Sequence, residues 1–165
     1  MERDYYMHRA VHAADLEAAA DIGRLAGERT VQALGARKIK SQQVPIIFDR
    51  RVSAGLVGHM AGSINGQSIA RGTSFLRECL GEQIFAANVQ IVDDPRRVRG
   101  LASAPFDGEG LAAEPLELVT DGVLQQWLLN LATARQLGLE SNGRGTRSVG
   151  ASPGVGATNL YMKAG

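Results

Sequence analysis

One histidine stands inside a glycine-rich stretch, AGLVGHMAGSING, that runs from residue 54 to residue 66. A hydrolytic zinc site on a helix needs two neutral imidazoles that converge on one ion, and a carboxylate that takes a proton from the bound water. This stretch offers His59 alone, and no carboxylate lies between Asp49 and Gly66. On a helical wheel, His59 falls on the apolar side with Met60. The pattern therefore favours a core histidine bonded to a backbone carbonyl over a metal ligand, and it identifies no catalytic residue.

The same stretch carries a row of small residues. Ala54, Gly58, Gly62 and Gly66 recur every four positions, so a helix here would have one edge almost without side chains. Each interior glycine costs about 1 kcal/mol of helix propensity relative to alanine, which predicts a compensating contact. Close approach of another backbone would supply it, either inside a tightly packed domain or at an interface with a partner.

Two further pairs could hold a cation. His8 and His12 have the i, i+4 spacing of ligands on one helix face, but no third ligand is near in the sequence, and a solvated helix start is favoured. Asp107 and Glu109 lie between glycines in APFDGEG and could bind a cation or backbone amides. A turn closed by its own aspartate is favoured, because hard-cation sites gather more oxygen ligands than this.

The arginines and the cysteine are less informative. The arginines of DPRRVRG and GRGTR could bind a phosphate or a peptide carboxylate, but on loops they are expected to be solvated. Cys79 is the only cysteine of the chain, which excludes an internal disulfide and an all-cysteine zinc site. Its apolar surroundings predict a packed, inert thiol.

Length and charge limit the function classes. The 165 residues are enough for a single domain, which we expect to span residues 1–165. Eighteen Lys and Arg against 17 Asp and Glu give a net charge of +1, so neither nucleic acid nor an anionic membrane is an expected partner. No apolar run approaches the roughly 20 residues of a membrane span, and the N-terminus lacks the apolar core of a secretory signal. We expect a cytoplasmic protein.

The elements that must position these residues follow from periodicity and turn signals. Two N-terminal helices are expected around a short strand: residues 15–34 with Asp15 as N-cap, the strand 44–48, and a helix from residue 50 to Gly66 capped by Asp49. A mainly antiparallel sheet with one short helix should follow, with strands at 74–79, 89–94, 116–120 and 123–128, a helix at 130–138, a mobile glycine-rich loop at 141–156 and a last strand near 159–165. The fold class is therefore α+β.

Taken together, the motifs resemble the TldD/PmbA family, and more closely its PmbA branch, which is also called TldE and has been labelled a modulator of DNA gyrase. The likeness runs from about Arg24 to the C-terminus and rests on GLVGHMAGSINGQSIARGTSFL, LGEQI, GLASAPFDGEG, LVTDGVLQQWLLNLATARQLGLESNGRG and TNLYMKAG, in that order. Chains of this family are much longer. The resemblance thus implies an internal segment of a full-length protein.

The family implies a cytoplasmic, zinc-dependent peptidase that is assembled as a TldD–TldE heterodimer, degrades unfolded peptides and removes leaders from modified, microcin-like peptides. In TldD-type subunits a His-Glu-x-x-x-His stretch supplies two zinc ligands and the general base. The first histidine of that motif falls here on Ala54, the glutamate on Gly55 and the second histidine on His59. The resemblance therefore implies a non-catalytic subunit without a cofactor of its own, with zinc in a TldD-type partner.

Two other functions stay open. One is a regulatory binding protein that acts on DNA gyrase or on a toxin–antitoxin system through protein contacts. The other is an independent metallopeptidase that uses His59 with ligands from outside the segment. Exposed glycine-rich and apolar edges also predict that the segment can self-associate.

Overall fold

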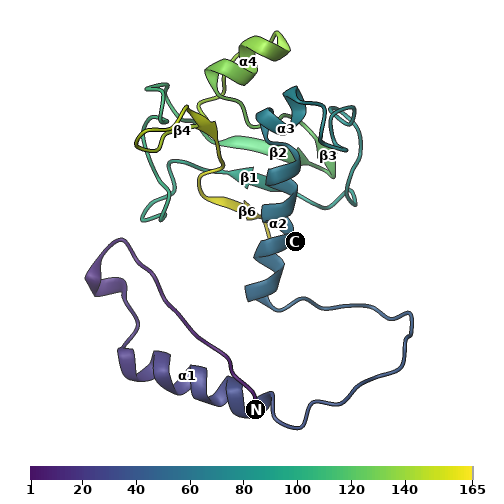
Figure 1. The fold of residues 1–165 in the computed structure, drawn as a ribbon, viewed down its shortest axis with the longest axis vertical. Helices are drawn as coiled ribbons and strands as arrows, with labels where there is room; N and C mark the ends of the chain where they lie inside the picture. The colour runs from purple at the N-terminus through teal and green to yellow at the C-terminus, as the bar shows by residue number, and fades with distance from the viewer. Residues whose placement is uncertain (165) are drawn as a thin grey trace. The chain divides into compact units, whose positions relative to one another are not determined.

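The computed structural model describes residues 1–164, which form two compact units, Met1–Ile47 and Phe48–Gly165 (Figure 1). Helices and an antiparallel sheet are both present, which confirms the α+β class. Whether both units belong to one domain stays a prediction. No helix among the described residues is long and apolar enough to cross a bilayer.

The first unit contains a short 3₁₀ turn, Ala13–Asp15, and the helix α1, Ala19–Gln32. The helix starts later than predicted because the backbone is extended from Leu16 to its N-cap Ala18, so the prediction of Asp15 as the cap is wrong. The predicted strand at 44–48 does not form, because no other strand pairs with it, and Ile47 is 97% exposed.

The second unit begins with the helix α2, Arg50–Ser63. As predicted, the side chain of Asp49 caps it, accepting a hydrogen bond of 2.9 Å from the backbone N–H of Arg51. The helix does not run on to Gly66, because Asn65 adopts an extended backbone and caps a separate short helix, α3, Gly66–Ala70. The side-chain amide of Asn65 also donates to the carbonyl of Val155 at 3.0 Å, which fixes this break.

Four antiparallel strands form the sheet in the order β3-β2-β1-β6. The hairpin at Asp121 and Gly122 is confirmed, with both residues at positive φ (50° and 79°), as a tight two-residue turn requires. The last strand is also confirmed, but residues 74–79 form turns rather than a strand. β3 is shorter than predicted, because its pairing with β2 ends at Val119 and Leu124. The bounds are β1 Ile91–Asp93, β2 Leu116–Thr120, β3 Val123–Leu124 and β6 Leu160–Met162.

The short helix α4, Leu131–Leu137, is confirmed, with Asn130 as its N-cap and Gly138 at φ 70° as its C-cap. The segment 141–156, predicted to be a mobile loop, is instead partly ordered by the two-stranded pairing of β4, Gly145–Thr146, with β5, Gly154–Val155. Its residues 143–145 are buried, so the chain is held down where glycine content alone predicted mobility.

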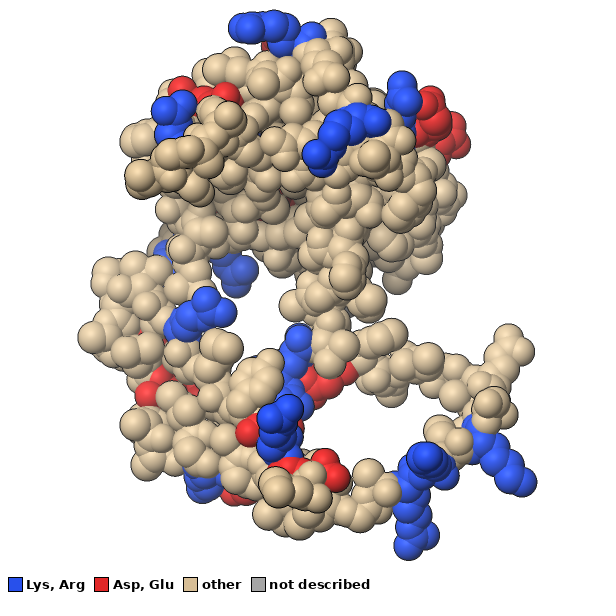
Figure 2. Space-filling model, viewed as in Figure 1, with Lys and Arg blue, Asp and Glu red and all other residues tan. Residues whose placement is uncertain are grey.

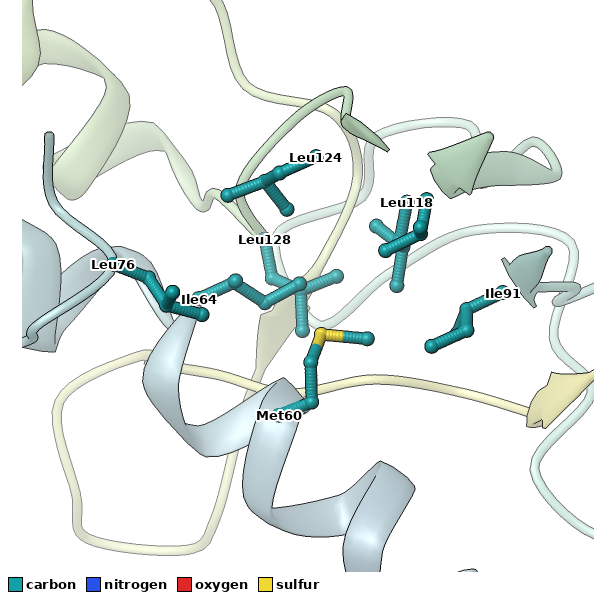
Figure 3. Close-up of a cluster of buried hydrophobic side chains, with 8 residues drawn as sticks. Met60, Ile64, Leu76, Ile91, Leu118, Leu124 and Leu128 are labelled. Carbon is teal, nitrogen blue, oxygen red and sulfur yellow. The ribbon is translucent and has the colours of Figure 1, made fainter. Parts of the chain in front are cut away.

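The main core lies between α2 and the sheet. Met60 on α2 and Ile64 at its end project toward Ile91 of β1 and Leu118 of β2 (Figure 3). All four side chains are less than a tenth exposed. This contact fixes which faces of α2 turn inward and which remain outside.

Candidate functional site

The small-residue edge of α2 is open over most of its length. A β-carbon added at Gly55, Gly58 or Gly62 would meet no atom within 4 Å. At Gly66 the same addition would lie 2.7 Å from the carbonyl oxygen of Leu128. Within the unit that contains α2, the close backbone contact predicted for this row is therefore made at its last glycine only, and the row along α2 has no packing partner among residues 48–164.

His59 lies on the surface, so the prediction of a core histidine is wrong for the described chain. Its side chain makes no hydrogen bond among the described residues, and it borders an open recess of about 430 Å³. The rest of that recess is mostly apolar, with Met60, Phe75 and Phe85 in its wall, and Phe75 is 79% exposed. The helical wheel correctly placed His59 on the same side of α2 as Met60. It could not show that the sheet covers only part of this apolar face and leaves His59 outside the covered part.

The residues around His59 do not fit a zinc site. Among residues 1–164, no three His, Cys, Asp or Glu side chains converge. Ala54 and Gly55, the positions at which the resemblance predicts the other histidine and the glutamate of the motif, are exposed and have no side-chain ligand atoms. The pair His8 and His12 is not on a common helix, and Nδ1 of His8 accepts a hydrogen bond of 3.2 Å from the backbone N–H of Glu17.

Asp107 closes its own turn, which was the favoured prediction for this loop, and both Asp107 and Glu109 accept hydrogen bonds from backbone amides. Asp107 accepts hydrogen bonds from the N–H groups of Glu109 (2.9 Å), Leu111 (3.0 Å) and Gly145 (2.7 Å). Glu109 accepts one of 2.8 Å from Leu131, the first residue of α4. The two carboxylates thus connect this loop to β4 and α4, a structural role that uses most of the acceptor sites of Asp107.

Arg144 is buried, although the sequence analysis predicted that it would be solvated. Expected on a solvated loop, it is 1% exposed, and its Nε donates to a carboxylate oxygen of the buried Asp93 at 2.5 Å. Its guanidinium also donates to the carbonyl of Glu114 at 2.7 Å, and Asp93 accepts from the N–H of Thr158 at 2.7 Å. Every part of this buried pair is hydrogen-bonded, so it joins β1, the loop before β4 and the loop before β6.

No large charged surface accompanies these features. On the face of the Phe48–Gly165 unit drawn in Figure 2, Lys and Arg side chains stand in small separate groups, with uncharged surface between them. This distribution gives no broad basic patch on that face.

Comparison with known proteins places the chain in a family. Residues 41–165 match the family model described as the PmbA/TldA metallopeptidase C-terminal domain. The metalloprotease PmbA of Escherichia coli O157:H7 is 41% identical over 143 residues, which are 87% of this chain but 32% of that protein. The chain therefore spans about a third of the length of this curated relative.

Solved structures of similar proteins have the same fold as this chain. A candidate modulator of a DNA gyrase from Thermotoga maritima MSB8 is 32% identical, with a TM-score of 0.84 over 94% of this chain and 35% of that one. TldE from Thermococcus kodakarensis shares the fold, with a TM-score of 0.72 at 20% identity over 88% of this chain and 34% of that one. The chain belongs to the PmbA/TldA metallopeptidase family, and its residues 41–165 match the C-terminal domain of that family.

Proposed function

We propose that this chain is part of a non-catalytic TldE/PmbA-type subunit that supports a zinc-bearing, TldD-type partner in the cytoplasm. The observation that carries the proposal is the set of residues on α2. The positions of the family's first histidine and glutamate hold Ala54 and Gly55, and His59 has no second ligand among residues 1–164. A single imidazole cannot hold a catalytic zinc ion, which uses three protein ligands.

The open edge of α2 supports the partner part of the proposal. Gly58 and Gly62 weaken the helix, and nothing among residues 48–164 occupies the space they leave. A partner backbone that packs against these glycines would offset the free-energy cost of placing them in a helix. The complex would act on unfolded peptides and on the leaders of modified peptides, with this subunit completing the chamber that holds them.

The test measures metal content and peptide hydrolysis of the full-length subunit, alone and after mixing with a TldD-type partner. We expect no stoichiometric zinc and no hydrolysis by the subunit alone, stable co-purification with the partner, and hydrolysis by the complex. His59→Ala should leave the zinc content and the hydrolysis rate of the complex unchanged. Hydrolysis and stoichiometric zinc in the isolated subunit, both lost in His59→Ala, would instead establish an independent metallopeptidase.

A regulatory role at DNA gyrase is the second candidate, because the names of solved relatives assign them this role. It predicts that the full-length subunit binds gyrase and alters its supercoiling rate in the absence of a TldD-type partner. Co-purification with gyrase instead of a TldD-type subunit would favour this candidate over the first.

A further inference from the structure

Within residues 48–164, the helix α2 is held at one end. Met60 is the one buried residue of Arg50–Ser63, and Val57, from the same half of the helix, is partly buried against the core. In the first half, Val52 and Leu56 are 57% and 50% exposed. The helix therefore projects from its unit, and its direction is determined by the contacts near its C-terminal end.

At that end, the side chain of Asn65 bonds in two directions. Its oxygen accepts a hydrogen bond of 2.9 Å from the backbone N–H of Gln67 and so caps α3. Its nitrogen donates one of 3.0 Å to the carbonyl of Val155 on β5, which is 90 positions away in the sequence. The backbone of Asn65 is extended, with ψ of 125°, so α2 and α3 cannot form one continuous helix. Asn65 therefore joins two helices and a strand.

Backbone groups next to Asn65 are also hydrogen-bonded, but to other parts of the unit. The N–H of Leu128 donates to the carbonyl of Ile64 at 3.0 Å, and the hydroxyl of Ser74 donates to the carbonyl of Ser63 at 2.5 Å. Both donors lie outside the helices and the paired strands. The side chain of Asn65 adds the bond that connects the end of α2 to a strand.

That strand is a firm anchor. Val155 pairs with Gly145 of β4, and the residue before Gly145 is Arg144, which is buried and paired with the buried Asp93. The N–H of Gly156 donates to the carbonyl of Arg144 at 3.0 Å, on the other side of Val155. A buried, fully hydrogen-bonded ion pair is costly to disturb, so the carbonyl that Asn65 contacts has a fixed position.

A small change of direction at Asn65 is magnified along α2. With a rise of about 1.5 Å per residue, Gly58 and Ala54 lie about 10 and 16 Å from Asn65 along the helix axis. A rotation of about 10° at the junction would therefore move Ala54 by about 3 Å. Close-packed backbones do not tolerate such a shift, because a gap of about 1 Å already removes about half of the attraction between two atoms in contact.

We propose that Asn65 is a positioning residue whose bond to Val155 sets the direction in which α2 projects, and thereby the geometry of the surface that α2 offers to a TldD-type partner. The part that concerns the partner rests on the proposed function. The direction of α2 is a property of the free subunit and can be measured without the partner.

Asn65→Asp separates the two bonds of this side chain, because a carboxylate can cap α3 but cannot donate to Val155. Asn65→Ser makes the same separation without adding a charge, since its hydroxyl is too short to reach Val155 while it caps α3. Asn142→Asp is the matched control. The nitrogen of Asn142 donates to the carbonyl of Trp127 at 2.7 Å, and its oxygen accepts from the N–H of Leu129 at 2.9 Å, so a similar amide loses a similar bond that does not reach α2.

The direction of α2 is measured in the full-length subunit as the distance between two spin labels. The labels are carried by unnatural amino acids at the exposed positions Arg50 and Gln125, so that Cys79 is left in place. We expect both Asn65 variants to shift or broaden this distance by about 2 Å or more, and Asn142→Asp to leave it unchanged.

Titration of the unlabelled variants with a TldD-type partner is the second measurement, at a temperature at which circular dichroism shows each variant to be folded. Both Asn65 variants should bind the partner about tenfold more weakly than the wild type, because a displaced α2 loses close packing. Asn142→Asp should change the affinity less than twofold. If Asn65→Asp does not fold, the comparison of Asn65→Ser with Asn142→Asp decides.

An unchanged label distance in the folded Asn65 variants would overturn the proposal, and so would an equal change in Asn142→Asp. A shifted distance with unchanged affinity would overturn the part that concerns the partner. A wild-type subunit that binds no TldD-type partner, but whose label distance shifts in the Asn65 variants alone, would remove the proposed function and support the positioning role of Asn65.

Discussion

Gly58→Ala should stabilise the free subunit and weaken its complex. The position is in the middle of α2, and an added β-carbon would meet nothing within 4 Å. The gain in helix propensity is about 1 kcal/mol, because alanine is the best helix former and glycine one of the poorest. That gain raises the ratio of folded to unfolded protein about fivefold. The same methyl group placed in a close-packed interface costs about 1–3 kcal/mol, which is roughly a 5- to 150-fold loss of affinity for the partner.

Gly66→Ala is the matched control on the same row. Here the β-carbon would lie 2.7 Å from the carbonyl oxygen of Leu128 and 2.8 Å from Oγ1 of Thr133, so the substitution should destabilise the free subunit by about 1–3 kcal/mol. The assay is urea unfolding of the full-length subunit, followed by titration of the folded variants with a TldD-type partner. Opposite signs of the stability change at Gly58 and Gly66 are the expected result.

Two outcomes would refute this account of the edge. Loss of stability in the free Gly58→Ala subunit would mean that another part of the same polypeptide packs on α2. A stabilised subunit that binds its partner with unchanged affinity would mean that the edge lies outside the interface.

Three more predictions follow from single contacts. Asp93→Asn leaves the buried Arg144 without its counter-charge and should lower the free energy of unfolding by about 3–5 kcal/mol, measured by urea denaturation. Gly122→Ala adds a methyl group against two backbone carbonyls in a turn with φ of 79°, so it should lower the Tm, in contrast to the increase expected for Gly58→Ala. The hydrogen bond from Lys163, with help from a threonine, lowers the pKa of Glu117 below its ordinary value of 4.5. A carboxyl group with a lowered pKa stabilises the fold above its unfolded pKa and loses that contribution as pH falls through the folded pKa. Glu117→Gln should therefore reduce stability slightly at neutral pH and have no effect near pH 2, and a carboxyl NMR titration should place the wild-type pKa below the ordinary value.

The sequence was sufficient to predict helix ends and turns that are determined by a few neighbouring residues. Asp49, Asn130 and Gly138 cap helices as side-chain and backbone preferences require. Asp121 and Gly122 form the turn that only residues tolerant of positive φ can form. These caps and this turn depend only on neighbouring residues, so they can be predicted from the sequence alone.

Features that depend on distant residues were predicted poorly. The run VPIIF at 44–48 has strand propensity, but a strand exists only when another strand pairs with it. Arg144 looked like a solvated loop residue because its partner Asp93 lies 51 positions away. For Asp107 the favoured turn was right, because two of its amide donors are near neighbours, but its bond to Gly145 could not be foreseen. Burial and long-range pairing are properties of the fold, which single-sequence patterns report only indirectly.

The histidine of α2 and the glycines beside it have a common physical explanation. Nothing among residues 48–164 limits the side chain at Gly55 or Gly58, so packing within this unit does not require small residues there. Glycines that weaken a helix without any gain inside its own unit imply a constraint from a surface outside that unit. His59 stands on the same exposed helix next to an apolar recess, where an unpaired imidazole is tolerated because water can hydrate it. The single histidine and the open edge of α2 are thus both consistent with the proposal that this helix contacts a partner.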